Sequence, residues 1–179
     1  VTKMRAREYI QKLQSFQNFK IDISADRLFH SIMLINPDAD FLYEYAKALA
    51  GEIMTDGKEN LVTQNKVDKE IHPDLFVVGK DKAIDAQGVK DLLSTLYVAP
   101  YEGDKKVYII NNFDDVAPNP ANKLLKTLEE PPAGTTFILL VKNETRVLQT
   151  LLSRAQKFYV EGYTEDELTS ILKEEGVQN

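Results

Sequence analysis

The stretch KKVYIINNFDDVAPNPANKLLKTLEEPPAGTTFILLV, residues 105–141, decides the fold. It begins with the apolar run 107–110 and ends with the apolar run 137–141, and a helical pattern lies between the two. Nearly continuous apolar runs are typical of parallel strands that are covered on both faces. Two such strands joined through a helix make a βαβ unit, so the stretch predicts an α/β fold with a mostly parallel sheet.

The connecting helix carries its own boundary signals. Asn119 suits an N-cap, and Pro120 suits the first helical position because the N–H that proline lacks would have no partner there. Pro131 and Pro132 end the helix. The pattern therefore predicts one helix between the two strands, with an apolar face made of Leu124, Leu125 and Leu128.

The same alternation of strand and helix continues on both sides of this stretch. Before it we expect strands over 28–35 and 75–78, each followed by a helix, the second of which Asp85 caps. After it we expect a short helix over 147–155 and a strand over 157–160. This order predicts a five-stranded, mostly parallel sheet with helices on both faces, a three-layer arrangement.

The chain after residue 162 has a different character. Residues 164–167 read Thr-Glu-Asp-Glu, a capping box that begins a helix with one apolar face. We interpret residues 1–162 as the core domain and residues 163–179 as the first helix of a truncated second domain. The alternative is a C-terminal helix that docks on the sheet.

Composition excludes several classes of site. The 179 residues are 43% hydrophobic and 28% charged, which is typical of a globular protein. The chain has no cysteine, which excludes disulfides, thiolate zinc sites, iron–sulfur clusters and a cysteine nucleophile. A net charge of −6 disfavours nucleic-acid binding through the overall field. No apolar run could cross a membrane, and the opening VTKMRAREYIQ lacks the apolar core of a signal peptide, so we expect a cytoplasmic protein with no membrane partner.

Four motifs in order carry a family resemblance. Residues 122–132, NKLLKTLEEPP, resemble the signature helix of the clamp-loader AAA+ subunits of bacterial DNA polymerase III. Residues 72–75 (HPDL), 99–103 (APYEG) and 151–155 (LLSRA) resemble further landmarks of that family. The similarity runs from about residue 29 to residue 162. Among the gamma/tau and delta-prime chains of this family, the delta-prime subunit is the most similar.

The resemblance implies a RecA-like, P-loop-NTPase-type AAA+ core that is followed by a helical lid and a collar domain. It implies a role in loading the sliding clamp onto primer-template DNA, in a complex with gamma/tau and delta subunits. That complex belongs to a DNA-directed DNA polymerase holoenzyme, a nucleotidyl transferase. Lys123 and Lys126 could face the DNA; alternatively they are ordinary solvated lysines.

The family also carries a four-cysteine zinc module between the first core helix and the second strand. The equivalent segment here, about residues 51–71, has no cysteine, so we expect no metal. The polar stretch 55–69 within it is expected to be an exposed loop. His30 and His72 are expected to be structural residues.

The nucleotide loop that the resemblance implies has lost its chemistry. A phosphate-binding loop needs glycines, a lysine for the phosphates and a Ser or Thr for magnesium. Here Leu42 stands at the lysine position and Tyr43 at the Ser/Thr position. Asp38 and Asp40 put negative charge where phosphate would arrive. An aspartate carboxylate at this position can cap the helix in place of the phosphate. Of the eight residues concerned only Pro37 fits: Asn36, Pro37, Asp38, Ala39, Asp40, Phe41, Leu42 and Tyr43.

The acidic pair that the family has after the third strand is also absent. Asn111 and Asn112 stand there, and an amide can neither act as a base nor replace a carboxylate near magnesium. Asn143 falls near the family's sensor position. We therefore predict that this chain uses no cofactor and does not hydrolyse ATP.

Arg154, preceded by Ser153, matches the arginine of the family's Ser-Arg-Cys motif, with Ala155 in place of the cysteine. The resemblance implies an arginine finger that acts in trans on a neighbouring subunit's ATP. The alternative is a surface arginine paired with a nearby acid. For the whole chain, the alternatives to a non-hydrolysing delta-prime-like subunit are an active gamma/tau-type ATPase and a free-standing interaction module.

Overall fold

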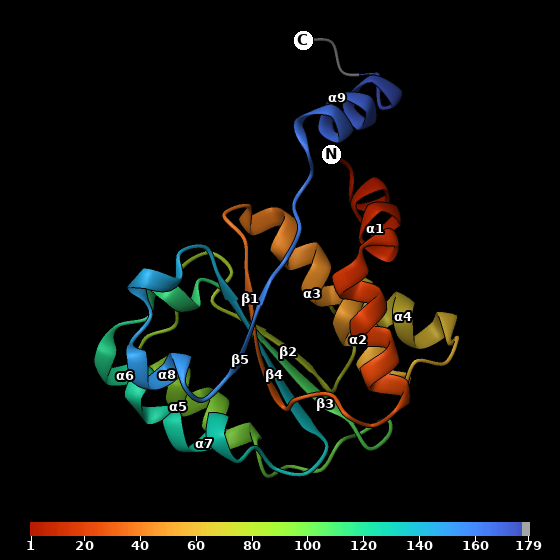
Figure 1. Cartoon of the computed structure of the whole chain (residues 1–179). Coiled ribbons are helices and arrows are strands. Elements are labelled where there is room, and N and C mark those ends of the chain that lie inside the picture. The colour runs from red at the N-terminus through yellow and green to blue at the C-terminus, as the bar shows by residue number, and fades with distance from the viewer. Residues whose placement is uncertain (177–179) are drawn as a thin grey trace.

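The computed structural model describes residues 1–176 (Figure 1). Its five strands form one parallel sheet in the order β2-β3-β4-β1-β5, as the sequence predicts. The strands are β1 (Ser31–Ile35), β2 (Leu75–Val78), β3 (Lys106–Ile110), β4 (Thr135–Val141) and β5 (Gln156–Tyr159).

The centre of the sheet explains the continuous apolar runs. Ile138 of β4 aligns with Ile32 of β1 on one side and Ile109 of β3 on the other. Every residue of these three strands is buried, since helices cover both faces. Alternate residues therefore enter two separate hydrophobic clusters, so that Ile32 lies in one and Met33 in the other.

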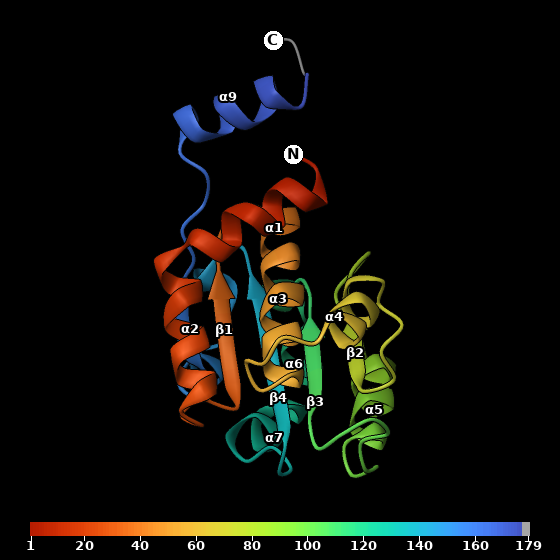
Figure 2. The same ribbon diagram turned by 90° about the vertical axis from the view of Figure 1, so that its right-hand side faces the viewer.

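The helices divide between the two faces, as Figure 1 shows. The face that Figure 2 presents to the viewer carries α1 (Lys3–Lys12), α2 (Gln14–Ser24), α3 (Ala39–Met54) and α4 (Leu61–Asp68). The opposite face carries α5 (Ala86–Thr95), α6 (Pro118–Lys123), α7 (Leu125–Glu129) and α8 (Gln149–Leu152). Two short 3-10 turns, η1 (Phe113–Asp115) and η2 (Glu144–Arg146), follow β3 and β4.

The expected loop over 55–69 is wrong, because α4 lies within it. The side chain of Asn60 caps this helix by accepting the N–H of Thr63 at 3.1 Å. Of the eight helical residues only Val67 is buried. A helix with one buried residue has no apolar stripe, and periodicity therefore could not reveal it.

Two N-terminal helices have no counterpart in the sequence analysis. α1 and α2 cover the sheet beside α3, and they bury Ile10, Phe16, Phe19 and Ile23. The spacing of the last three residues is helical and could have revealed α2.

The helix between β3 and β4 also differs from its prediction. Ala117, not Asn119, is the N-cap, and Pro118 takes the first helical position. Both prolines fit a first turn, so the sequence alone left the start ambiguous. The helix is divided into α6 and α7 at Leu124, whose N–H bonds Ala121, three residues back, instead of the residue four back.

The last helix, α9 (Glu165–Glu174), begins where the capping box predicts, and the Thr164 hydroxyl accepts the N–H of Glu167 at 3.1 Å. No residue of α9 is buried, and Figure 1 shows it beyond the carboxyl ends of the strands, beside the start of α1. Arg5 of α1 contacts Glu174 at 3.1 Å. The division into residues 1–162 and 163–179 stays a prediction. Within residues 1–176, no helix is long and apolar enough to cross a membrane.

Two buried charges fix the loop that leads from α5 into β3. Asp74, 1% exposed, accepts the N–H groups of Tyr101 at 2.7 Å and Glu102 at 2.9 Å. The buried ammonium of Lys106 donates to the carbonyl groups of Thr95 and Val98. A carboxylate buried with two N–H donors is strongly stabilised, and the donors depend on it in turn.

Replacing Asp74 by Ala should lower the free energy of unfolding by about 2 kcal/mol, because two part-buried N–H groups would lose their charged acceptor. Urea denaturation followed by circular dichroism measures the change. Asp81→Ala is the matched control, since Asp81 is exposed and its side chain has no hydrogen bond or ion pair within the described chain. Equal stability of the two variants would contradict this role of Asp74.

Candidate functional site

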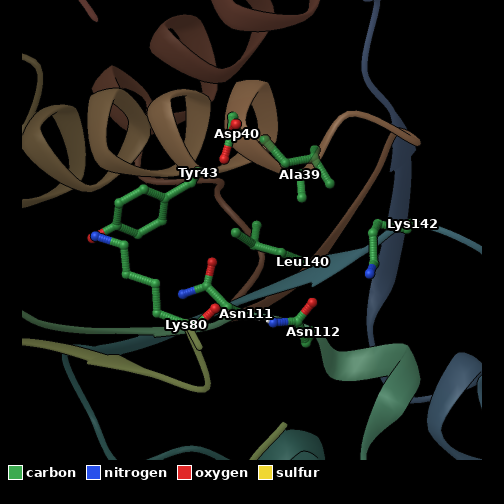
Figure 3. A pocket seen from close by; sticks show the side chains of 9 residues that line it. Ala39, Asp40, Tyr43, Lys80, Asn111, Asn112, Leu140 and Lys142 are labelled. Carbon is green, nitrogen blue, oxygen red and sulfur yellow. Dashed lines mark hydrogen bonds between the residues drawn. The ribbon is translucent and has the colours of Figure 1, made fainter. Parts of the chain in front are cut away.

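A small pocket lies where β1, β3 and β4 end. Parallel sheets place their ligands at this edge. The pocket has a volume of about 110 Å³ and brings the stretch 36–43 beside Asn111 and Asn112 (Figure 3). Its lining residues are Ala39, Asp40, Leu42, Tyr43, Lys80, Asn111, Asn112, Leu140 and Lys142.

The chain between β1 and α3 is short and firmly bonded. The buried Asn36 side chain donates to the carbonyl of Val160 at 2.9 Å and accepts the N–H of Asp38 at 2.8 Å. Gly162 passes so close that a Cβ there would lie 3.1 Å from the Asn36 amide nitrogen. The loop is thus tied to the segment that leaves β5, and Pro37 lies at its exposed tip.

Helix α3 begins immediately after this turn. The Asp38 carboxylate accepts the N–H of Phe41 at 3.1 Å, so the cap that we expected from an aspartate is present. The carbonyl of Asp38 accepts the N–H of Leu42 at 3.0 Å. Residues from Ala39 onward are therefore helical, and Asp40 adds a second carboxylate in the first turn, near the positive end of the helix dipole.

Leu42 and Tyr43 point into the protein. Leu42 is buried in the cluster between α3 and the sheet. Tyr43 is buried as well, and its hydroxyl donates to the carboxylate of Glu70. The ammonium of Lys80 lies 4.6 Å from the centre of the Tyr43 ring, as Figure 3 illustrates. The ring and this lysine together close one side of the pocket.

An ion network around a buried lysine supports the tyrosine. Lys47, 1% exposed, lies 3.3 Å from Glu44 and 4.0 Å from Glu70. Burial and the hydrogen bond to Glu70 raise the pKa of Tyr43, which therefore remains a neutral donor. Burial alone would raise the pKa of Glu70, but the Tyr43 hydroxyl and the two lysines outweigh it and lower that pKa. Glu70 is thus ionised at neutral pH.

The two asparagines after β3 are bonded to the β2 side. Asn111 donates to the carbonyl of Val78 at 3.2 Å, and Asn112 donates to the carbonyl of Gly79 at 2.8 Å. Asn112 has a left-handed backbone with φ of 50°. Gly79 is required here, because its φ is +73° and a Cβ would lie 2.6 Å from the Asn111 carbonyl oxygen.

One acid at this edge was not singled out by the sequence analysis. The buried Asp114 accepts the N–H groups of Lys142 at 3.3 Å and Asn143 at 3.2 Å, and so joins η1 to the end of β4. Asn143 itself caps η2 through the N–H of Thr145. Only the position of Asp114 just after a strand could have indicated its role. Among residues 1–176, no three His, Asp or Glu side chains are grouped so as to hold a metal.

Arg154 lies at the opposite edge of the sheet. It precedes β5, whose Gln156 aligns with Ile32 near the start of β1. Its guanidinium donates to the carbonyl of Thr150 at 2.7 Å and to the hydroxyl of Ser153 at 3.2 Å, and its Nε lies 3.7 Å from Glu129. These side chains border a hollow of about 420 Å³. Arg154 therefore does not reach the pocket of its own chain.

The remaining predicted residues lie apart from both regions. Lys123 and Lys126 are exposed on α6 and α7. His72 is buried and accepts the N–H of Asp74 at 3.0 Å, which confirms a structural role. His30 is exposed just before β1, so the expected structural role of its side chain has no support here.

Comparison with known proteins finds relatives of one family. Residues 11–163 match the family described as DNA polymerase III, delta subunit. The DNA polymerase III subunit delta' of Bacillus subtilis is 36% identical over 92 residues, covering 51% of this chain and 28% of that protein. The DNA polymerase III subunit gamma of Buchnera aphidicola is 26% identical over 121 residues, covering 68% of this chain and 34% of that protein. The chain thus spans about a third or less of these relatives.

A solved structure shares the fold. The DNA polymerase III gamma subunit-related protein of Thermotoga maritima superimposes with a TM-score of 0.62 at 20% identity. The match covers 88% of this chain and 49% of that protein. The likeness confirms the expected three-layer P-loop-type AAA+ core.

Replacing Glu70 by Gln should lower the free energy of unfolding by about 1 kcal/mol at neutral pH, since a partly buried carboxylate would lose its charged contacts. Because the pKa of Glu70 is lowered in the folded state, its stabilisation exists above the unfolded pKa and disappears as the pH falls through the folded pKa. The difference between wild type and variant should therefore stay constant from about pH 7 down to the unfolded pKa of about 4.3, and shrink as the pH falls further.

Urea denaturation at several pH values measures this difference. Glu59→Gln is the control, because Glu59 is exposed and has no side-chain partner within the described residues. A difference between wild type and Glu70→Gln that does not change with pH would show that the carboxylate charge is unimportant.

Proposed function

The chain belongs to the DNA polymerase III delta-subunit family, and from this premise we propose that it is a non-hydrolysing, delta-prime-like subunit of the clamp loader. In this role it helps to load the sliding clamp onto primer-template DNA during replication in the cytoplasm. Its partners are the gamma/tau and delta subunits, and it reaches the clamp and DNA through the assembly. It binds no nucleotide and acts on the ATP site of a neighbour.

The observation that carries the proposal is the start of α3. A phosphate-binding loop offers free backbone N–H groups to the phosphates. Here the Asp38 carboxylate accepts the N–H of Phe41, and the N–H of Leu42 is bonded within the helix. The protein thus places its own anion where phosphate would bind, and a second carboxylate, on Asp40, adds repulsion. Loss of the lysine and of one such N–H weakens binding by about two to four decades.

The size and lining of the pocket support the same conclusion. Ligand pockets have volumes of about 300–1,000 Å³, whereas this pocket has about 110 Å³. Tyr43 stands where a magnesium-binding hydroxyl would be, and its own hydroxyl is bonded to Glu70. Asn111 and Asn112 provide amides instead of carboxylates, and neither amide can accept a proton from an attacking water.

The position of Arg154 supports an action in trans. The nucleotide pocket of a P-loop-type sheet lies at the carboxyl ends of the strands, while Arg154 precedes β5 at the amino ends. Its guanidinium therefore cannot serve its own chain. In a ring of subunits it can project into a neighbour's site, where a guanidinium stabilises the charge of the transition state.

Calorimetric titration of the full-length subunit with magnesium-ATP should show no binding at about 1 mM nucleotide. The reason is that the Asp38 carboxylate occupies the amino end of α3 and that the pocket beside it is small. Binding in the micromolar range would overturn the proposal and favour the gamma/tau-type ATPase. The similarity with gamma subunits would then include the nucleotide site.

In a clamp loader reconstituted with the full-length subunit, Arg154→Ala should lower the DNA-stimulated ATPase rate by about tenfold or more, because one site loses its finger. The hydrolysis of ATP in the presence of clamp and primed DNA is the measurement. Arg27→Ala is the control, since Arg27 is an exposed arginine paired with Asp22 on α2. An unchanged rate with Arg154→Ala would exclude the finger and leave the interaction module as the better description.

A further inference from the structure

The acid beside Arg154 stands on a fixed helix end. Glu129 is the last residue of α7. The residue before it, Leu128, is buried, and its carbonyl accepts the hydroxyl of Ser31 of β1 at 2.6 Å. The end of α7 is therefore attached to the sheet, and the backbone of Glu129 has a defined position beside the hollow that Arg154 borders.

The Arg154 side chain is folded back on its own chain. One terminal nitrogen donates to the carbonyl of Thr150 and to the hydroxyl of Ser153, both on or next to α8. The Nε atom is buried and has no hydrogen-bond acceptor within residues 1–176. The carboxylate of Glu129 lies 3.7 Å from it and is the ion-pair partner of Arg154 in the described chain.

This arrangement determines where the positive charge rests. A guanidinium remains charged at all physiological pH values, so its direction depends on which anion it faces. The Glu129 carboxylate offers one negative charge and a single long contact. The triphosphate of a nucleotide carries more charge and can accept bidentate hydrogen bonds from arginine. The triphosphate of a neighbour's nucleotide can thus displace the Glu129 carboxylate from Arg154. Water cannot, because it carries no negative charge.

We infer that Glu129 is a positioning residue that keeps Arg154 withdrawn until a neighbouring subunit presents nucleotide. The inference rests on the proposed function, because it specifies how the finger is regulated. Extension of Arg154 breaks the contact with Glu129. Each time Arg154 reaches a neighbour's nucleotide, the loss of this contact therefore costs a small amount of free energy. Removing the carboxylate charge should therefore make the finger easier to extend.

The first experiment needs no activity. In the isolated chain, a ¹⁵N–¹H spectrum reports the buried Nε–H of Arg154. Glu129→Gln should shift this resonance, because it removes the nearest negative charge. The matched control is Glu130→Gln: Glu130 is the next residue, is exposed, and has no side-chain partner in the described part of the chain. Because Glu129 is itself 63% exposed, neither variant should change the melting temperature. An unshifted resonance in Glu129→Gln would overturn the inference.

The second experiment uses the reconstituted loader with the full-length subunit. Glu129→Gln should raise kcat/KM for ATP by about 1.5- to 5-fold, the range expected for one partly exposed ion pair. Glu130→Gln should leave it unchanged, and Glu129→Asp, which keeps the charge, should return it toward the wild-type value. In the Arg154→Ala background, Glu129→Gln should have no effect, because the two residues act together.

The outcomes separate the two claims. If Arg154→Ala alone leaves the ATPase unchanged, the proposed finger is wrong. If Arg154→Ala lowers the rate but Glu129→Gln and Glu130→Gln behave alike, the finger stands and the role of Glu129 is wrong. A fall in kcat/KM with Glu129→Gln would also overturn the proposed role of Glu129, since Glu129 would then support the extended arginine.

Discussion

Burial of a parallel sheet on both faces is the constraint on which this structure depends. β4 pairs with β1 and β3, and all residues of the three strands are buried. Parallel strands need crossover connections, and these, together with the N-terminal helices α1 and α2, supply the helices that cover the two faces. All five strands also end at the same edge of the sheet. The small pocket therefore lies at one edge, and Arg154 lies at the other.

At the carboxyl edge, the protein satisfies its own charges. Helix α3 would offer an anion site at its amino end, but the Asp38 carboxylate takes that place. Tyr43 fills the adjoining space and donates to Glu70, which in turn has two lysines nearby, Lys80 at 3.4 Å and Lys47 at 4.0 Å. Asp38, Tyr43 and Glu70 thus each have a partner from the chain itself. This arrangement supports our proposal that the edge binds no nucleotide.

At the amino edge, hydrogen bonds made by residues in or next to the strands fix the neighbouring segments. Asp74 and Lys106 organise the loop before β3, and the Ser31 hydroxyl fixes the end of α7. Arg154 is the exception, because its Nε remains without a hydrogen bond within the described chain and its side chain is 32% exposed. Such a charged group has a stable resting place and can still leave it at low cost. The trans-acting finger that we propose for Arg154 would need both properties.

The sequence by itself determined the strands, the crossover helices and the cap of α3. Apolar runs, helical spacing and an aspartate after a strand are local signals, and local signals can be read along the chain. The family motifs added the expected roles of residues 36–43 and of Arg154. α4 escaped detection because it buries only Val67, and the start of α6 was ambiguous because two prolines fit it equally well.

Only the tertiary structure decided which charges meet. Tyr43 is hydrogen-bonded to Glu70, which lies 27 residues later in the sequence, and Arg154 faces Glu129, which lies 25 residues earlier. No local sequence pattern predicts such pairs. The stretch 36–43 comes beside Asn111 and Asn112 because β1 and β3 both flank β4. The physical reason is that burial and partner choice belong to the packed sheet, since a carboxylate's environment is set by segments that only folding brings together.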